Sequence, residues 1–148
     1  MEEISVICRN EDETVAFAQK LSQIAKVGDT FALFGTLGMG KSVFARGFVQ
    51  SLTAAEEVPS PTFTLVQSYE APDFEIYHFD LYRLKAPEEI FELGMEEALY
   101  GGVCLIEWPE KMAGWLPENC FKLTITPDAF GRRITISSAS AEKLSRLR

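Results

Sequence analysis

The stretch FALFGTLGMGKS, residues 31–42, decides the fold that we expect for this chain. Its first four residues are apolar, which is typical of a short strand buried in a parallel sheet. Three glycines, one lysine and one serine follow within the next eight residues, and a helical pattern comes after them. A glycine-rich turn between a buried strand and a helix directs backbone N–H groups toward one point, where they can surround an anion.

The turn matches the full spacing G-x4-G-K-S, from Gly35 to Ser42. Its glycines allow positive φ angles, and the helix that follows directs its N-terminal amides at the same point. We therefore predict a phosphate-binding loop, in which Lys41 bridges the β- and γ-phosphates and the Ser42 hydroxyl binds Mg²⁺. The alternative is a chance glycine-rich turn with an accidental lysine, and the flanking strand and helix argue against it. The candidate nucleotide-binding residues of the loop are Gly35, Thr36, Leu37, Gly38, Met39, Gly40, Lys41 and Ser42.

Length and composition indicate what kind of protein carries this loop. The chain has 148 residues, of which 47% are hydrophobic, so we expect one domain, residues 1–148, with a substantial core. No apolar run approaches the roughly 18 residues of a membrane span, and the start, MEEISVICRN, lacks the basic and apolar parts of a signal peptide. A cytoplasmic location is therefore expected. The three cysteines are far apart and odd in number, which favours buried, reduced thiols.

Strands and helices alternate in the first half of the chain, and hairpins follow in the second half. This order predicts an α/β layer fold with a mixed sheet. The expected helices are 12–25, 41 to about 54, 87–100 with a break near Gly94, and a short one in the tail AEKLSRLR. The expected strands are 30–34, a hairpin of 62–69 with 74–79, the buried strand 103–106, and a second hairpin of 121–126 with 133–137.

A phosphate loop that binds Mg²⁺ needs a second carboxylate on the metal side, and two strands end in one. Glu107 follows VCLI, and Asp80 follows EIYHF. Both are expected to project from strand ends toward the phosphates, as catalytic residues and metal ligands. The sequence leaves an alternative open for each: Glu107 as an exposed residue at a strand end, and Asp80 as a turn cap ahead of LYRL.

Four further residues have a functional and a structural interpretation. Thr62, in the proline-bounded SPTF, can reach the metal or the γ-phosphate as a switch segment does, or can simply enter a strand. His78 alternates along its strand, which favours a packed histidine over a catalytic one. Trp108 can cover the site or pack beside it. Arg132 can approach a nucleotide or be a solvated hairpin residue, and the same two alternatives hold for its neighbour Arg133.

Several motifs, taken in order, resemble one family. GTLGMGKS with FARGF, SPTFTLVQSY, HFDLYRL and LIEWPE is similar to the TsaE (YjeE) family of small bacterial P-loop ATPases. The resemblance covers about residues 14–136. It implies a P-loop nucleotide-binding fold whose mixed sheet has a parallel core, with ATP or ADP and Mg²⁺ as cofactors. It also implies work alongside TsaB and TsaD, which with TsaC attach threonylcarbamoyl to adenosine 37 of ANN-decoding tRNAs, this protein being the ATPase needed for repeated turnover.

The resemblance also assigns roles to individual residues. It implies that the loop from Gly38 to Ser42 contacts phosphates and that Asp80 and Glu107 are needed for metal binding and hydrolysis, with Asp80 either orienting water or holding Mg²⁺ through water. Trp108 lies near the nucleotide, and Arg132 and Glu11 approach the adenine from two sides. The chain departs from the family pattern at Met39, where a small residue is usual, and at Ser42, where threonine is common. Neither change is expected to abolish binding, because position 39 is variable and either hydroxyl serves the metal.

Three other functions share the loop. A small-molecule or nucleotide kinase needs an acceptor pocket and an arginine-rich lid, but only Arg132 and Arg133 cluster and no lid-sized insertion occurs. A regulatory GTPase needs an N/T-K-x-D segment, which is missing. The third is a binding module that needs a nucleotide but barely hydrolyses it. The resemblance to the TsaE family partly includes this possibility, because slow hydrolysis is expected without partners. The net charge of −8 makes direct tRNA contact unfavourable, so a role on tRNA is expected to pass through partner proteins.

Overall fold

The computed structural model describes residues 3–36, 38, 40–53, 55–59, 61 and 64–147. The strands are β1 (Glu3–Cys8), β2 (Thr30–Phe34), β3 (Val66–Glu70), β4 (Glu75–Asp80), β5 (Val103–Glu107), β6 (Phe121–Asp128) and β7 (Gly131–Ser137). The helices are α1 (Glu11–Ser22), α2 (Lys41–Leu52), α3 (Met95–Gly101) and α4 (Ala141–Ser145), with 3-10 helices η1 (Pro87–Leu93) and η2 (Pro109–Trp115). None of the helices in this part of the chain is both long and apolar enough to cross a membrane.

One mixed sheet, of seven strands in the described residues, has the order β1-β7-β6-β2-β5-β4-β3. Strands β6, β2, β5 and β4 run parallel to one another. On one edge β3 pairs antiparallel with β4, and on the other β7 pairs antiparallel with both β6 and β1. Strand β2 pairs on both sides and is almost fully buried, which explains its continuous apolar sequence TFALF. The predicted mixed sheet with a parallel core is confirmed.

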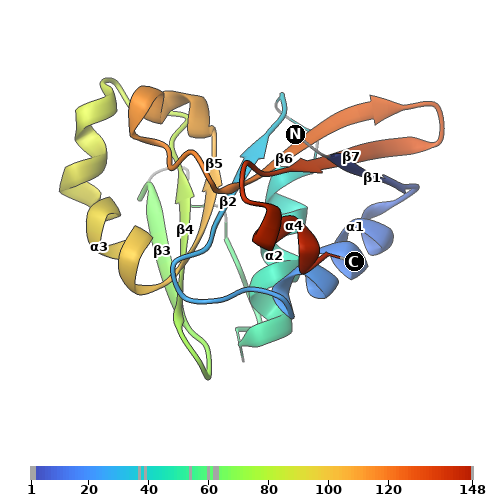
Figure 1. Cartoon of the computed structure of the whole chain (residues 1–148), viewed down its shortest axis with the longest axis horizontal. Helices are drawn as coiled ribbons and strands as arrows, with labels where there is room; N and C mark the ends of the chain where they lie inside the picture. Colours follow the sequence, from blue (N-terminus) through green and yellow to red (C-terminus); the bar gives the residue numbers. More distant parts are fainter. Residues whose placement is uncertain are drawn as a thin grey trace.

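Helices cover both faces of this sheet, and Figure 1 shows α1 and α2 to the right of β2 and α3 to its left. The face under α1 and α2 is packed with aromatic rings: Phe31 stacks on Phe121 at a centroid distance of 4.7 Å and contacts Phe48 at 5.1 Å. Gly47 lets α2 approach α1 closely, because a Cβ there would lie 3.0 Å from the Val15 Cα. Helices α3, η1 and η2 cover the other face, over Phe79 and other apolar residues.

Alternation along β4 and β5 decides which side chains reach the α2 face. Val103 and Leu105 belong to the apolar cluster under α1 and α2, whereas Cys104 and Ile106 belong to the cluster under α3. By this period of two, Glu107 at the end of β5 points to the α2 face. Ile76 of β4 belongs to the cluster under α1 and α2, so the period of two places His78 and Asp80 on that face as well.

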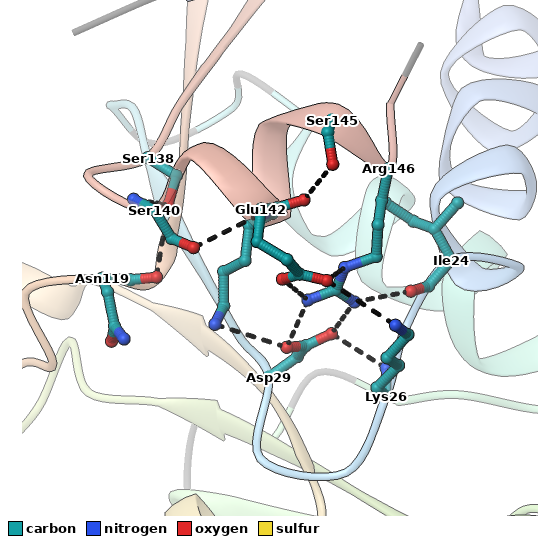
Figure 2. Close-up of polar contacts among 10 residues, drawn as sticks. Ile24, Lys26, Asp29, Asn119, Ser138, Ser140, Glu142, Ser145 and Arg146 are labelled. Carbon is teal, nitrogen blue, oxygen red and sulfur yellow. Dashed lines mark hydrogen bonds and ion pairs between the residues drawn. The ribbon is translucent and has the colours of Figure 1, made fainter.

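The C-terminal helix α4 is tied to the amino end of β2 by a group of charges, shown in Figure 2. Arg146 donates from both terminal nitrogens to Asp29, at 2.7 and 3.2 Å, and also to the Ile24 carbonyl at 2.8 Å. Lys143 lies 3.7 Å from the same carboxylate, and Arg146 also pairs with Glu142. Asp29 is only 3% exposed. Hydrogen bonding to Asp29 raises the pKa of Arg146. These charges therefore lock the last helix onto the sheet.

Several predicted elements differ in detail from the observed ones. Residues 3–8, for which no element was expected, form β1 and pair antiparallel with β7 from Glu3↔Ser137 to Cys8↔Arg132. The predicted helix 87–100 is a 3-10 helix followed by a short α-helix, and the expected break is at Gly94, where φ is +75°. The 3-10 helix η2 was not expected. Strand β3 begins at 66 rather than 62, and positions 62 and 63 lie outside the described residues.

The remaining boundaries shift by a few residues. Helix α1 covers Glu11–Ser22 instead of 12–25, and α2 ends at Leu52 instead of near 54. The second hairpin is longer than expected, since β6 continues to Asp128 and β7 starts at Gly131. All three cysteines are free and buried, as predicted, and burial raises the pKa of Cys104 to about 12.

Candidate functional site

A cleft of about 650 Å³ lies beyond the carboxyl ends of β2, β4 and β5. This is the edge at which open α/β sheets bind their ligands. Its walls come from the loop before α2, the ends of β4 and β5, the start of α1 and the start of β7. Five stretches that are far apart in the sequence therefore share one cavity.

The glycine-rich loop has the backbone shape that its sequence predicts. Gly35, Gly38 and Gly40 have φ angles of +150°, +82° and +101°, which residues with a Cβ rarely adopt. Gly40 is the N-cap of α2, so the free amides of the first helical turn lie beside the loop. Gly38 and Gly40 line the cleft. Thr36 is exposed, and Leu37 and Met39 lie outside the described residues.

Lys41 is the buried cation of the site, only 5% exposed. Its Nζ donates to the Gly35 carbonyl at 2.6 Å and lies 3.6 Å from the centroid of the Trp108 ring. Among the described residues it makes no ion pair with a carboxylate. Burial lowers the pKa of Lys41, and attraction to Glu107 and other nearby carboxylates opposes this shift without cancelling it. The ammonium group is therefore desolvated, and no carboxylate of the described residues contacts it.

Glu107 and Asp80 lie side by side, because they are register partners on the parallel strands β5 and β4. Both are buried, with exposures of 3% and 5%. Glu107 Oε1 accepts a hydrogen bond from Ser42 Oγ at 3.2 Å, so the strand end and the loop meet directly. Asp80 Oδ1 accepts from the Tyr82 amide at 3.1 Å. Glu107 is thus not an exposed strand end, whereas Asp80 both caps a turn and lines the cleft.

His78 has a contact that the sequence did not reveal. It is 1% exposed, as expected for a histidine packed in a strand, but its Nε2 lies 2.6 Å from Glu107 Oε2. Its Nδ1 is buried and makes no hydrogen bond to any of the described residues. The available sequence signal was the spacing of two from Asp80, which puts both side chains on one face. Recognising the contact to Glu107 also required the register of β4 against β5.

Trp108 covers Lys41 and is itself supported by another ring. Its φ and ψ are +59° and +48°, a left-handed conformation that costs a non-glycine residue roughly 1–3 kcal/mol. The indole stacks on Tyr82 with ring centroids 4.9 Å apart. Of the two alternatives for Trp108, covering the site and packing beside it, the geometry favours covering. Tyr82 lines the cleft as well and was not singled out from the sequence.

The far wall of the cleft contains Arg132 and Glu11. Arg132 Nη2 lies 3.5 Å from the Gly38 carbonyl, so this guanidinium reaches the loop. Arg133 instead pairs with Asp128 at 3.2 Å on the exposed side of the hairpin. Only one arginine of the pair therefore faces the cleft, in agreement with the alternation of side chains along β7. Thr62 lies outside the described residues.

The donor atoms at this edge suit a hard cation. Ser42 supplies a hydroxyl oxygen, and Glu107 and Asp80 supply carboxylates. Mg²⁺ prefers oxygen ligands, keeps several waters and needs only one or two protein carboxylates. Within the described ranges, no group of three or more His, Cys, Asp or Glu side chains forms a closed metal site. The residues present fit Mg²⁺ beside a phosphate group better than a protein-enclosed metal.

This fold and loop define the class of P-loop α/β proteins: a buried parallel strand, a glycine-rich turn, a helix and a carboxylate from the neighbouring strand. Within that class, the chain belongs to the TsaE family. The model of the family "Threonylcarbamoyl adenosine biosynthesis protein TsaE" matches residues 8–134. The resemblance seen in the sequence motifs is therefore confirmed.

Two relatives and one solved structure illustrate this membership. The chain is 49% identical over 106 residues to a protein of Rickettsia felis, covering 71% of this chain but only 62% of that protein. It is 46% identical over 120 residues to a protein of Rickettsia bellii, covering 80% and 83%. Both are named tRNA threonylcarbamoyladenosine biosynthesis protein TsaE. The crystal structure of Bacillus subtilis YdiB is similar with a TM-score of 0.80, at 30% identity over 99% of this chain and 90% of that one.

Proposed function

We propose that this protein is a Mg²⁺-dependent ATPase that serves threonylcarbamoylation of adenosine 37 in ANN-decoding tRNAs. One observation carries the ATPase part: Lys41 is a buried cation on a carbonyl oxygen and an aromatic face, next to the Ser42–Glu107 pair. A phosphate chain would supply the anion that this cation lacks in the described part of the chain. Family membership and the names of the relatives support the tRNA part.

The phosphates would bind between the loop and Lys41. The amides of Gly38, Gly40 and the first turn of α2 provide donors, and the helix dipole favours negative charge there. Lys41 Nζ would leave the Gly35 carbonyl for the β- and γ-phosphate oxygens. Ser42 Oγ and Glu107 would hold Mg²⁺, which when bound neutralises the charge on the transferred phosphoryl group.

Hydrolysis would proceed by in-line attack of water on the γ-phosphorus, giving ADP and phosphate. Asp80, beside Glu107, would orient that water or a water on the metal, and Lys41 with the loop amides would stabilise the charge that develops. Among the described residues, two arginines line the candidate cleft, Arg9 and Arg132, and Arg132 reaches the Gly38 carbonyl of the loop. We expect slow turnover by the chain alone and faster turnover with partner proteins.

The adenine would lie at the other end of the cleft, between the starts of α1 and β7. Glu11 and Arg132 line this end, and Cys8 and Thr14 form its apolar and hydroxyl floor. Gly131 lets the start of β7 lie close to the end of β1, because a Cβ there would clash with the Cys8 carbonyl oxygen. Thr62 keeps its predicted switch role near the γ-phosphate.

The proposed partners are TsaB and TsaD, in the cytoplasm. The acidic chain, with a net charge of −8, supports a role through proteins rather than through direct contact with tRNA. ATP binding or hydrolysis would act on the TsaB–TsaD complex to permit repeated turnover. A kinase acting on a small molecule or nucleotide is the alternative that shares the loop.

A pull-down with purified TsaB–TsaD, with and without Mg²⁺–ATP, tests the partner proposal. We expect association that depends on nucleotide, and Lys41→Ala, which removes the phosphate contact, should lose that dependence. No association in either condition would favour the kinase. Phosphate release from ATP should fall about 100-fold in Glu107→Ala, which loses a metal ligand. An unchanged rate would remove the role assigned to Glu107.

A further inference from the structure

His78 and Glu107 form a buried polar pair at the candidate site. The side chains are 1% and 4% exposed, and Nε2 of the histidine lies 2.6 Å from Oε2 of the glutamate. No role in the proposed ATPase has been given to His78 so far. Both side chains are buried, and an unpaired polar group in such a place would be costly.

The two oxygens of Glu107 have different partners. Oε2 contacts His78 on the β4 side, and Oε1 accepts from Ser42 on the α2 side. With Glu107 as a carboxylate, which only accepts hydrogen bonds, Nε2 is the protonated nitrogen of this pair. Because the other ring nitrogen, Nδ1, has no hydrogen-bond partner within the described ranges, the Glu107 carboxylate is the polar group there that orients the ring and is oriented by it.

Sheet register explains why this pair forms. Glu107 is opposite Asp80, and His78 is opposite Leu105, so His78 and Glu107 are diagonal neighbours on one face. Two residues in such a diagonal position can touch when one of them has a long side chain, as Glu107 has. The pairing of β4 with β5 fixes the distance between their backbones. His78 thus approaches Glu107 from the side opposite to the phosphate loop.

We propose that His78 is a positioning residue for the metal ligand Glu107. By holding Oε2, it turns Oε1 toward Ser42, so that hydroxyl and carboxylate present their oxygens to one cation. Partners behind a ligating carboxylate typically change metal affinity by about 10–100-fold when removed. This inference rests on the proposed function, because the cation concerned is the Mg²⁺ of the proposed ATPase.

Two amide variants of His78, which differ in side-chain length by one methylene, test the proposal. In His78→Gln the side-chain amide nitrogen can occupy the place of Nε2, whereas in His78→Asn it sits near the place of Nδ1 and cannot reach Glu107. Mn²⁺ binding to the full chain in complex with ADP, followed by electron paramagnetic resonance, gives the metal affinity without any turnover. We expect about 10-fold weaker binding in His78→Asn and a value within about 3-fold of wild type in His78→Gln.

Ile76→Val is the matched control, because Ile76 is on the same face of β4, two residues further from Glu107. It should lower the melting temperature slightly and leave the Mn²⁺ affinity unchanged. If His78→Asn binds Mn²⁺ as wild type does, or if His78→Gln is as weak as His78→Asn, the hydrogen bond to Glu107 does not position the metal ligand and the proposal is overturned.

A second measurement needs no substitution at His78. The chain has a single histidine, so the imidazole ¹⁵N spectrum of the whole protein has one set of signals. We expect a protonated Nε2 in the metal-free protein and a change in its signal in Glu107→Gln. A proton on Nδ1 alone would overturn the inference while leaving the proposed ATPase intact. Wild-type protein that binds no Mn²⁺–ADP would instead remove the proposed function, and this inference with it.

Discussion

The buried charges at the two ends of strand β2 have different partners. At the amino end, the buried Asp29 pairs with Lys143 of α4 and with Arg146, the residue that follows this helix. Figure 2 shows the Arg146 guanidinium directed at the Asp29 carboxylate. At the carboxyl end, Lys41 rests on a carbonyl oxygen and an indole ring, and burial lowers its pKa. At the amino end, the carboxylate and its cations are in direct contact. At the carboxyl end, Glu107 and Asp80 lie near Lys41, but neither forms an ion pair with it in the part of the chain that the structure describes.

This difference suggests different roles: the charges at the amino end stabilise the fold, and the cation at the carboxyl end binds a ligand. Buried charges in contact stabilise the folded chain only as a set, since removing one leaves the others uncompensated. A desolvated cation without such a contact destabilises the folded state and is retained where a ligand supplies the missing charge. We therefore expect changes at the amino end to alter stability alone, and changes at the carboxyl end to alter binding.

The largest effect is expected at the amino end. Asp29→Asn keeps the size of the side chain but leaves Arg146 and Lys143 without their carboxylate, so the free energy of unfolding should fall by about 3 kcal/mol. Chemical denaturation measures this loss. Lys26→Ala is the control, because the Lys26–Glu142 pair is exposed and should contribute less than about 1 kcal/mol. Equal losses in the two variants would contradict the buried-cluster account.

The next effect is expected at the carboxyl end. Lys41→Ala removes the cation that the phosphates need, so the affinity for Mg²⁺–ATP should fall by at least about 100-fold, which is ~2.7 kcal/mol. Isothermal titration calorimetry measures it, and Asp29→Asn, kept below its melting temperature, should bind ATP as wild type does. A Lys41→Ala variant with wild-type affinity would exclude the phosphate-loop assignment.

A smaller effect is expected at the ring that supports Trp108. Tyr82→Ala removes the stacked partner of the indole, and we expect the stability to fall by about 1 kcal/mol, while Tyr82→Phe keeps the stack. Thermal unfolding compares the two, and ATP affinity should follow the same order. If Phe and Ala at this position behave alike, the stack does not hold Trp108 over the site.

The smallest effect concerns the pH dependence of stability. Because the pKa of Lys41 is lowered in the folded chain, folding penalises its protonated form at neutral pH, and the penalty disappears as pH rises through the folded pKa toward the ordinary value of 10.5. Lys41→Met should therefore be more stable than wild type at pH 7, and the difference should shrink toward pH 10.5. Denaturation curves at several pH values check this, and a difference that grows with pH would have the wrong sign.

The sequence predicted the parts of this molecule that depend on local pattern. The parallel core followed from continuous apolar runs such as VCLI, and the acidic strand ends followed from their position after those runs. Family motifs added Arg132 and Glu11, which line the same cleft. These features need only the order of residues along the chain and the general rule that parallel strands end at a common edge.

The features that were missed depend on contacts between distant segments. Strand β1 pairs with a strand more than 120 residues away, and its short, partly exposed sequence gives little local signal. The His78–Glu107 pair depends on the register of two strands. For Trp108 the sequence left covering and packing both open, because the choice depends on a left-handed backbone that no pattern predicts. The same holds for Tyr82, which reaches the site through its stack on Trp108.

A crystal structure of the chain with Mg²⁺ and a non-hydrolysable ATP analogue tests the central claim most directly. The account predicts that Lys41 Nζ leaves the Gly35 carbonyl for the β- and γ-phosphate oxygens, with the metal on Ser42 and beside Glu107, and with the Asp29–Arg146 contact unchanged. A nucleotide bound elsewhere, or bound in the cleft while Lys41 still donates to Gly35, would contradict it.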